Sequence, residues 1–259
     1  MKTRIDKLLV DRGLAASRQR AQALILAGKV LVDDQKLEKA GAQVSAECVI
    51  RLLGEDLKYV SRGGLKLEGA LKHWNISVVG KVCLDVGAST GGFTDCLLQH
   101  GASQVIAVDT GYGQMDFGLR QDARVQLLEK TNARYLKRED LKLEALSQAA
   151  GGVTVELVAM DVSFISAALV LPAVIGAAFP ESVSGRRGRQ IVVLVKPQFE
   201  AGREHVGKGG IVRDEAAQLA AVEKVRTALG SLGAVETDTI DSPILGAEGN
   251  REFLLYGVL

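Results

Sequence analysis

An apolar strand passes directly into a helix within Cys83-Leu84-Asp85-Val86-Gly87-Ala88-Ser89-Thr90-Gly91-Gly92-Phe93. Glycines at such a junction let the backbone approach a ligand closely, and the helix start presents unpaired N–H groups. Dinucleotide-binding proteins carry Gly-x-Gly-x-x-Gly here, whereas this chain has Asp-x-Gly-x-x-x-Gly-Gly. The carboxylate of Asp85 would repel a pyrophosphate and suits the cationic amino-acid end of a ligand. The junction therefore predicts a ligand site of another kind.

The next predicted strand, Gln104–Val108, ends in Asp109. An acid at that strand end can accept both hydroxyls of a ribose. A nucleoside joined to an amino acid, without phosphate, describes S-adenosylmethionine. Asp85 and Asp109 together predict this cofactor. The alternative is an ordinary tight turn with an unrelated acid nearby.

Outward from this junction, residues 80–259 alternate between strand and helix patterns, which predicts an α/β domain around a parallel sheet. The expected strands are Val82–Val86, Gln104–Val108, Val125–Leu128, Val155–Met160, Ile191–Val195, Val235–Ile240 and Glu252–Val258. The expected helices are Gly92–His100, Ile165–Ala178 and Glu215–Leu232, with a poorer candidate at Arg138–Ala149.

Residues 1–58 predict a separate, small α+β unit. One helix spans Arg4–Val10, and a second, Arg18–Ala27, follows an N-cap at Ser17 and stops at Gly28. Short strands follow at Val30–Val32 and within Val44–Leu53. Residues 59–79 form a linker and a helix, Leu65–Trp74, which we expect Ser61 to cap.

The net charge of +1 hides a basic N-terminus. Residues 1–30 hold seven Lys or Arg against two Asp, a local charge of +5, which indicates a polyanionic partner. Aromatic residues are absent from residues 1–58, so folded RNA is favoured over base stacking on single strands. The candidate RNA-binding residues are Arg4, Lys7, Arg18, Arg20 and Lys29. A merely solvated basic helix pair is the alternative.

The cysteines and the apolar runs of the sequence indicate the cellular compartment in which we expect the protein. The three cysteines have no metal-ligand spacing and the three histidines are scattered, so we expect no metal, no disulfide framework and a cytoplasmic protein. The longest apolar run, Ala167–Phe179, contains Pro172 and falls short of the roughly 20 residues of a spanning helix. We therefore expect no membrane association. The sequence does not indicate an oligomeric state.

Four further residues are candidates for chemistry. Asp161 follows an apolar strand, Lys196 ends another, and Glu252 begins the last strand, so all three are expected at sheet edges where ligands bind. Lys66 lies near the edge of the apolar stripe of its helix. Each has an ordinary alternative: a helix cap for Asp161, a surface lysine for Lys196 or Lys66, and a solvated strand start for Glu252.

Together, Lys66, Asp161, Lys196 and Glu252 resemble the Lys-Asp-Lys-Glu tetrad of FtsJ-like ribose 2′-O-methyltransferases. The whole chain resembles the TlyA family, which joins an S-four-type RNA-binding domain to such a Rossmann-like, S-adenosylmethionine-dependent domain. The matching blocks are Arg4–Val10, Ser17–Val32, Ser61–Leu71, Asp85–Asp95, Asp161–Ser166, Lys196–Glu200, Val206–Asp214 and Ser242–Phe253. One departure is Glu215, where we expect proline in many relatives.

The resemblance implies methylation of a ribose 2′-hydroxyl in 16S or 23S ribosomal RNA, with cytidine as the expected nucleotide and ribosomal RNA or subunits as partner. It implies Lys196 as general base, Asp161 and Glu252 as acids that position Lys196, and Lys66 as the group that holds the target ribose or phosphate. The implied cofactor contacts are Asp85, Gly87, Ser89, Gly91, Gly92, Phe93, Asp109, Asn132 and Asp161.

Three other functions compete with this interpretation. A ribosome-binding protein without turnover is disfavoured by the intact tetrad. The label attached to this family suggests a membrane-active hemolysin, but the sequence shows no spanning segment that would support this function. An S-four-type pseudouridine synthase needs no S-adenosylmethionine and leaves the glycine turn without a purpose.

Overall fold

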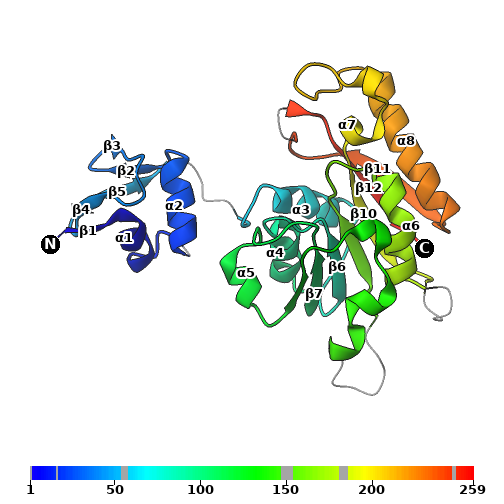
Figure 1. The fold of residues 1–259 in the computed structure, drawn as a ribbon, viewed down its shortest axis with the longest axis horizontal. Coiled ribbons are helices and arrows are strands. Elements are labelled where there is room, and N and C mark those ends of the chain that lie inside the picture. Colours follow the sequence, from blue (N-terminus) through cyan, green and yellow to red (C-terminus); the bar gives the residue numbers. More distant parts are fainter. Residues whose placement is uncertain (1, 16, 54–57, 147–153, 181–185, 247–248) are drawn as a thin grey trace. The chain divides into compact units, whose positions relative to one another are not determined.

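The computed structural model describes residues 2–15, 17–53, 58–146, 154–180, 186–246 and 249–259 (Figure 1). The chain divides into two compact units, Met1–Leu57 and Lys58–Leu259. Each has its own apolar core, because Ile5, Leu9 and Ile25 pack together in the first unit and a large sheet organises the second.

The N-terminal unit packs two helices, α1 (Ile5–Asp11) and α2 (Arg18–Leu26), on small sheets. Ser17 caps α2 by accepting a hydrogen bond from the Arg20 N–H at 3.1 Å, which confirms the expected cap. Strand β1 (Lys2–Arg4) pairs with β4 (Gln43–Ser45), while β2 (Val30–Val32) pairs with β3 (Gln35–Lys36) and β5 (Ile50–Leu52). The alternating segment Val44–Leu53 therefore supplies strands to two different sheets.

The second unit is built on seven strands in the order β11-β12-β10-β9-β6-β7-β8. They are β6 (Val82–Val86), β7 (Gln104–Val108), β8 (Val125–Leu128), β9 (Leu157–Met160), β10 (Gln190–Val195), β11 (Glu236–Asp241) and β12 (Phe253–Val258). Strands β8, β7, β6, β9 and β10 run parallel, but β12 is antiparallel to both β10 and β11. The expected parallel sheet is thus a mixed one.

Helices cover both faces of this sheet (Figure 1). One face packs against α3 (Gly63–His73), α4 (Gly92–Gln99) and α5 (Phe117–Gln121), and the other against α6 (Ala167–Ala178) and α8 (Glu215–Ser231). Strand side chains alternate between the two layers, so Leu84 and Val86 meet the α6 side while Cys83 meets the α4 side. Two apolar layers therefore fix the sheet from both sides.

Two local expectations need correction. Helix α3 begins at Gly63 with Arg62 as its N-cap residue, so Ser61 does not cap it. The segment Arg138–Ala149 is not an α-helix as far as it is described: it forms two 3₁₀ turns, Arg138–Leu141 and Leu143–Leu146, separated by Lys142 at φ 46°. Its residues 147–149 lie outside the described part of the chain.

Glu215, where proline was expected in many relatives, lies at a helix start that suits either residue. Glu215 is the first residue of α8, directly after the N-cap Asp214, whose carboxylate accepts a hydrogen bond from the Ala216 N–H at 2.9 Å. Proline suits the first helical position because its missing N–H would have no partner there. An acidic residue suits it equally, since it meets the positive end of the helix dipole.

Three short helical segments remain in the described part of the second unit, one of them a 3₁₀ turn at Arg203–His205. Helix α7 (Pro197–Glu200) directly follows β10, and a 3₁₀ turn spans Ala133–Tyr135. Among the residues that the structure describes, every helix is too short or too polar to cross a bilayer.

Candidate active site

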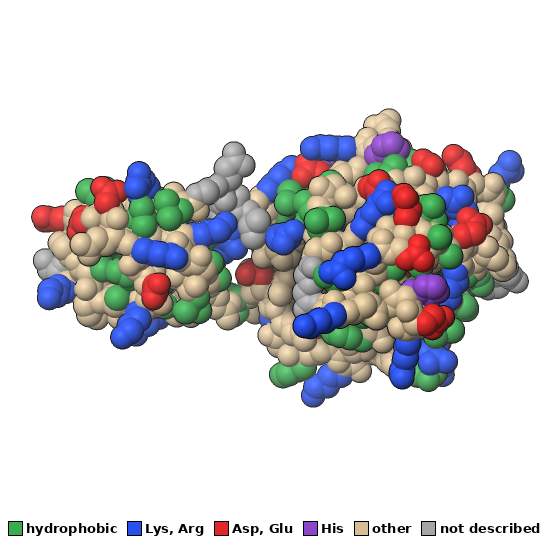
Figure 2. Space-filling view, turned by 90° about the horizontal axis from the view of Figure 1, so that it is seen from above, with side chains coloured by type: hydrophobic (Ala, Val, Ile, Leu, Met, Phe, Trp, Pro, Cys, Tyr) green, Lys and Arg blue, Asp and Glu red, His purple; other side chains and the backbone are tan. Residues whose placement is uncertain are grey.

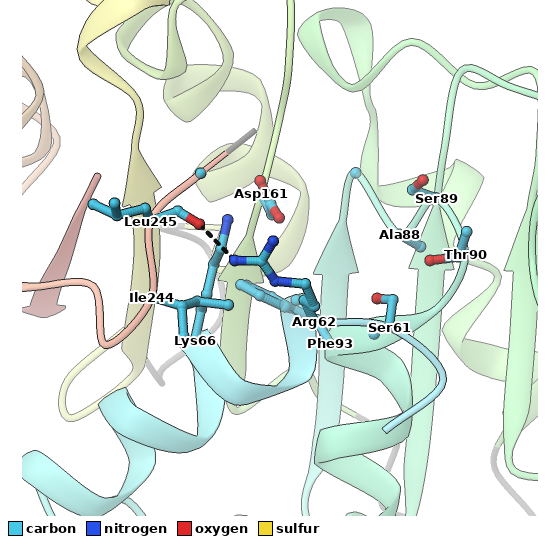
Figure 3. Close-up of a pocket in the computed structure, with 14 residues that line it drawn as sticks. Ser61, Arg62, Lys66, Ala88, Ser89, Thr90, Phe93, Asp161, Ile244 and Leu245 are labelled. Carbon is cyan, nitrogen blue, oxygen red and sulfur yellow. Dashed lines mark hydrogen bonds between the residues drawn. The ribbon is translucent and has the colours of Figure 1, made fainter. Parts of the chain in front are cut away.

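Two adjoining cavities lie at the carboxyl ends of the parallel strands and share Gly87, Ser89 and Asp161. The first, of about 250 Å³, is lined by Arg62 just before α3, by Lys66 of α3 and by the glycine turn (Figure 3). The second, of about 350 Å³, opens toward the ends of β7 and β8. The latter volume is within the range of small-molecule sites.

The turn after β6 supplies the backbone wall shared by both cavities. Gly87 has a φ of +87°, and a Cβ there would overlap the backbone oxygen of Asp161. The N–H groups of Gly87 and Ala88 both bond the Val108 oxygen, at 2.8 and 3.1 Å. This junction therefore requires glycine, and it exposes backbone to a ligand in the cavities. Gly91, at φ +95°, shapes the turn without lining either cavity.

Asp109 and Asn132, two of the residues expected to contact the cofactor, line the second cavity. The Asp109 carboxylate accepts hydrogen bonds from the Ser89 N–H at 2.8 Å and the Gly111 N–H at 2.6 Å. The Asn132 side-chain oxygen accepts one from the Arg134 N–H at 3.0 Å. These bonds fix an acid and an amide beside a partly apolar wall formed by Val162, Ile165 and Val170. The second cavity therefore combines fixed hydrogen-bonding groups with an apolar wall.

Asp85 does not lie where it was expected. Its side chain is fully buried and lines neither cavity; instead its carboxylate accepts a hydrogen bond from Thr94 Oγ1 at 2.6 Å. The physical reason is strand alternation, which turns Asp85 toward the α4 layer, away from the open strand ends. Burial raises the pKa of Asp85 to about 7, with Asp161 adding a smaller upward effect against the Thr94 hydrogen bond. A direct contact between Asp85 and the cofactor is thus not supported.

The raised pKa of Asp85 predicts a pH-dependent stability. Between pH 4 and 7 the folded chain keeps a proton on Asp85 that the unfolded chain has lost, so the free energy of unfolding should fall as pH rises. The expected slope is about 1 kcal/mol per pH unit from this group. Asp85→Asn should flatten the dependence. Urea unfolding at pH 4.5 and 7.5, followed by Trp74 fluorescence, measures the difference. Identical slopes in the variant and the natural chain would refute the assignment.

The four tetrad residues form two amine–carboxylate pairs. Lys196 Nζ lies 2.5 Å from Asp161 Oδ1 and donates a hydrogen bond to Ser163 Oγ at 2.7 Å. Lys66 Nζ lies 2.5 Å from Glu252 Oε2. Side-chain exposure is 10% for Lys196 and 21% for Asp161, but only 2% for Glu252. Lys66, at 11%, is as shielded as Lys196, so the two pairs differ in their acids, of which Glu252 is the more deeply buried.

This pairing corrects the expected roles of the acids. Glu252 contacts Lys66, whereas it was expected beside Lys196 together with Asp161. Lys66 and Asp161 line the first cavity directly, as do Gly92 and Phe93 (Figure 3). The cavity wall therefore carries one member of each pair. An amine near a bound methyl donor can accept a proton, and a second amine can hold an anionic or hydroxyl-bearing substrate.

Sequence reasoning missed several residues of this site. Arg62 lines the first cavity and donates a hydrogen bond to the Leu245 oxygen at 3.1 Å, which ties the start of α3 to the segment before β12 (Figure 3). Ser163 contacts Lys196. Their signals were weak: Arg62 directly precedes a Gly-Gly pair, and Ser163 comes two residues after Asp161.

The candidate RNA-binding residues of the N-terminal unit are organised by Asp6. This buried carboxylate accepts hydrogen bonds from Arg4 at 2.9 and 3.0 Å, and from Arg18 and Gln22 at 3.0 Å each. The Arg4 side chain beside it holds the pKa of Asp6 far below its usual range. Arg4 and Arg18 are nevertheless about half exposed, so their guanidinium groups can also face a ligand.

The other three basic candidates, Lys7, Arg20 and Lys29, lie on the same unit and are described by their exposure. Lys7 is exposed, whereas Arg20 and Lys29 are half-buried. Figure 2 shows Lys and Arg side chains on the visible face of this unit. The basic character expected from the first 30 residues is therefore present at the surface.

The comparisons with known proteins agree with both units. Residues 59–258 match the model of the FtsJ-like methyltransferase, and residues 3–50 match the S4 domain. A Mycobacterium tuberculosis protein named 16S/23S rRNA (cytidine-2′-O)-methyltransferase TlyA is 45% identical over 98% of this chain and 89% of its own length. Hemolysin A of Brachyspira hyodysenteriae is 39% identical over 99% of this chain and its full length.

A solved structure supports the same assignment. A protein of Streptococcus thermophilus described as a hemolysin has a TM-score of 0.69 and 41% identity, covering 99% of this chain and 88% of its own. Both the sequence match and the structural match extend over nearly the whole chain, so each includes both units. The chain belongs to the FtsJ-like methyltransferase family, and it joins that domain to an S4 domain.

Proposed function

We propose that this protein transfers a methyl group from S-adenosylmethionine to a ribose 2′-hydroxyl of ribosomal RNA, with a cytidine of 16S or 23S RNA as the target. The observation that carries the proposal is the convergence of the Lys196–Asp161 and Lys66–Glu252 pairs beside the glycine-walled cavities. The relative from Mycobacterium tuberculosis, which is named for this reaction, supports the choice of substrate.

The cofactor fits the second cavity and the adjoining glycine turn. When bound, S-adenosylmethionine supplies an electrophilic methyl group on a positive sulfur. In this chain Asp109 would hold the ribose hydroxyls, Asn132 would contact the adenine side, and Gly87 would present backbone close to the amino-acid part. The close approach at Gly87, which excludes a Cβ, is the observation that supports the fit.

Lys196 is the general base of the proposed reaction. In its neutral form its amine would take the proton of the 2′-hydroxyl as the hydroxyl oxygen bonds the methyl carbon, and the carbon–sulfur bond would break to release S-adenosylhomocysteine. Asp161 and Ser163 hold the amine in place through contacts of 2.5 and 2.7 Å. Lys66, fixed by Glu252, holds the target ribose or its phosphate in the first cavity.

The N-terminal S4 domain holds the RNA, with Arg4 and Arg18 as phosphate contacts oriented by Asp6. Guanidinium groups suit phosphate because they offer several donors in one plane. Ribosomal RNA or a ribosomal subunit is therefore the partner. The cytoplasm, where ribosomes and reduced thiols occur together, is the compartment we assign to the protein.

Deletion of residues 1–57 should separate RNA binding from cofactor binding. Removing the S4 domain takes away the phosphate contacts, so affinity for ribosomal RNA should fall at least about 10-fold and depend less steeply on salt. The cofactor cavities lie wholly within Lys58–Leu259, so the dissociation constant of S-adenosylmethionine should change less than about 3-fold. Calorimetric titration and filter binding measure the two constants. Loss of cofactor binding would contradict the independence of the units.

A methyl-transfer assay tests the proposed function. Purified protein is incubated with ribosomal subunits and S-adenosylmethionine labelled in its methyl group, and label in the RNA is counted. Subunits from cells that lack the protein provide unmodified sites. Transfer to RNA of the small or large subunit supports the proposal, whereas absence of transfer to either overturns it.

A further inference from the structure

Two sequence blocks that follow the members of the first pair lie against one another. The block 161–166 begins with Asp161, and the block 196–200 begins with Lys196. They meet first at the 2.5 Å contact between these two side chains, and again at Phe164 and Phe199, whose ring centroids are 5.4 Å apart. The far ends meet at Ser166 and Glu200. The catalytic pair is therefore one end of a longer seam between the two blocks.

Glu200 closes the far end of this seam. Its carboxylate accepts hydrogen bonds from Ser166 Oγ and from the Ala167 N–H, each at 2.5 Å, and Lys224 Nζ lies 3.2 Å from it. Lys224 also donates a hydrogen bond to the Glu200 backbone oxygen at 2.9 Å. Glu200 is 7% exposed, so the contacts lie in a region largely shielded from water. A shielded hydrogen bond to a charged acceptor is stronger than an ordinary surface bond.

Glu200 belongs to α7, but its carboxylate lies against the first residues of α6, which explains why its hydrogen bonds to Ser166 and Ala167 are favourable. Ser166 is the N-cap residue of α6 but makes no side-chain cap to its own helix. Glu200 supplies the missing acceptor from another segment, and its negative charge meets the positive end of the helix dipole. The start of α6, and with it the end of the Asp161 block, is thus fixed to α7 and the Lys196 block.

The Asp161 block needs such a restraint because part of it is strained. Phe164 has a φ of +64°, in the left-handed region that non-glycine residues rarely adopt, and it is 93% exposed. A strained backbone of this kind persists only when the surrounding structure holds it. With Asp161 on one side of Phe164 and Ser166 on the other, fixing Ser166 limits where Asp161 can lie.

We propose that Glu200 is a positioning residue that fixes the Asp161 block against the Lys196 block and thereby sets the geometry of the Lys196–Asp161 pair. This inference rests on the proposed methyl transfer. Glu200 touches neither cavity, so it acts through the pair and not on the substrate. A purely structural cap of α6 would lower stability alone, whereas a positioning residue lowers the rate of the chemical step in protein that is still folded.

Glu200→Gln in the full-length chain tests this role, because it keeps the side-chain shape and removes the charge. We expect kcat for methyl transfer to fall about 10- to 100-fold, since small misplacements of a reacting group cost rates of that order. KM for the cofactor and for RNA should change less than about 3-fold, because Glu200 lines neither cavity. The pH profile of kcat should also shift. Glu223→Gln, an exposed neighbour on α8 that pairs with Arg226, is the matched control and should keep the natural kcat and KM.

A second variant tests the route through Ser166. Ser166→Ala removes one of the two bonds to Glu200 and should lower kcat several-fold. Combined with Glu200→Gln, it should cost less than the product of the two single losses, because both changes break one contact. If Glu200→Gln does not fold at the assay temperature, Ser166→Ala alone decides: a kcat within 2-fold of the natural chain overturns the inference.

The outcomes separate this inference from the proposed function. If Lys196→Ala abolishes transfer and folded Glu200→Gln keeps kcat within about 2-fold, Glu200 is only a structural cap and the inference is overturned alone. The inference is also overturned if the loss of kcat in the Ser166→Ala, Glu200→Gln double variant equals the product of the two single losses. If the natural chain transfers no methyl group to ribosomal RNA, both proposals are overturned together.

Discussion

Lys196→Ala is expected to lower kcat for methyl transfer at least about 100-fold, because a positioned general base contributes 10²- to 10⁴-fold to a proton-transfer step. Lys196 ends β10, and its amine lies 2.5 Å from Asp161 and 2.7 Å from Ser163. Removing the amine leaves the cofactor cavity intact, since Lys196 does not line it. Affinity for S-adenosylmethionine should therefore stay within about 3-fold. Initial rates at saturating RNA and cofactor, together with calorimetric titration, measure both effects.

A lysine elsewhere on the same domain provides the control. Lys72 lies on α3, is largely exposed and pairs with Glu68, so Lys72→Ala should leave kcat unchanged. A Lys196→Ala variant with the natural kcat would remove Lys196 from the chemistry. If Lys66→Ala then abolished kcat and left the KM for RNA unchanged, the roles of the two lysines would be reversed.

Glu252→Ala is expected to destabilise the catalytic domain by about 3 to 5 kcal/mol, the usual cost of removing one partner of a buried ion pair. The side chains of Lys66 and Glu252 are 11% and 2% exposed, so the Lys66 amine would remain buried without its carboxylate. Trp74 is the single tryptophan of the chain and stacks on Tyr256 of β12 at 5.1 Å between ring centroids. Its fluorescence during urea unfolding therefore reports on this domain.

Replacing both partners separates stability from chemistry. Lys66→Met combined with Glu252→Leu removes both buried charges, and should recover most of the stability lost in Glu252→Ala. It should remain inactive in methyl transfer, because the amine that holds the target is gone. A Glu252→Ala protein within about 1 kcal/mol of the natural chain would show that this pair is not effectively buried. Activity in the double variant would exclude Lys66 from substrate binding.

The strand-to-helix pattern predicted most of the catalytic domain because five of its strands, β6, β7, β9, β10 and β12, are buried on both faces. The bounds of β6, β7 and β8 were predicted to the residue, since apolar runs end sharply at Gly87, Asp109 and Glu129. The direction of β12 was not, because an apolar run in the middle of a sheet reads the same in either orientation. Its antiparallel pairing with β10 and β11 appears only in the folded chain.

The residues of the site were identified from sequence more reliably than their contacts. Glu252 was expected beside Lys196, and this was wrong: its partner is Lys66, a contact that depends on the packing of α3 on β12, which no local pattern encodes. Asp85 was expected in the cofactor site because it lies close to the carboxyl end of β6, where ligands bind. Strand alternation directs it beneath α4 to Thr94, and that outcome could have been predicted.

The contacts of Glu200 and Ser163 show a different limit. Both residues were inside recognised sequence blocks, yet nothing local distinguishes a carboxylate that caps a distant helix from one that faces solvent. Glu200 reaches Ser166, 34 positions earlier in the chain, because β10 and β9 are neighbours in the sheet. Strand order therefore decides which blocks meet, and a single sequence without an alignment leaves that order open.

Mass spectrometry of nucleosides tests the central claim most directly. Ribosomal RNA from cells lacking the protein is incubated with the purified chain and S-adenosylmethionine that carries an isotopically heavy methyl group, and is then digested to nucleosides. We predict the heavy methyl on the ribose fragment of cytidine, and none with Lys196→Ala. A heavy methyl on a base fragment, or no heavy methyl in the RNA, would contradict the assignment of this chain as a ribose 2′-O-methyltransferase.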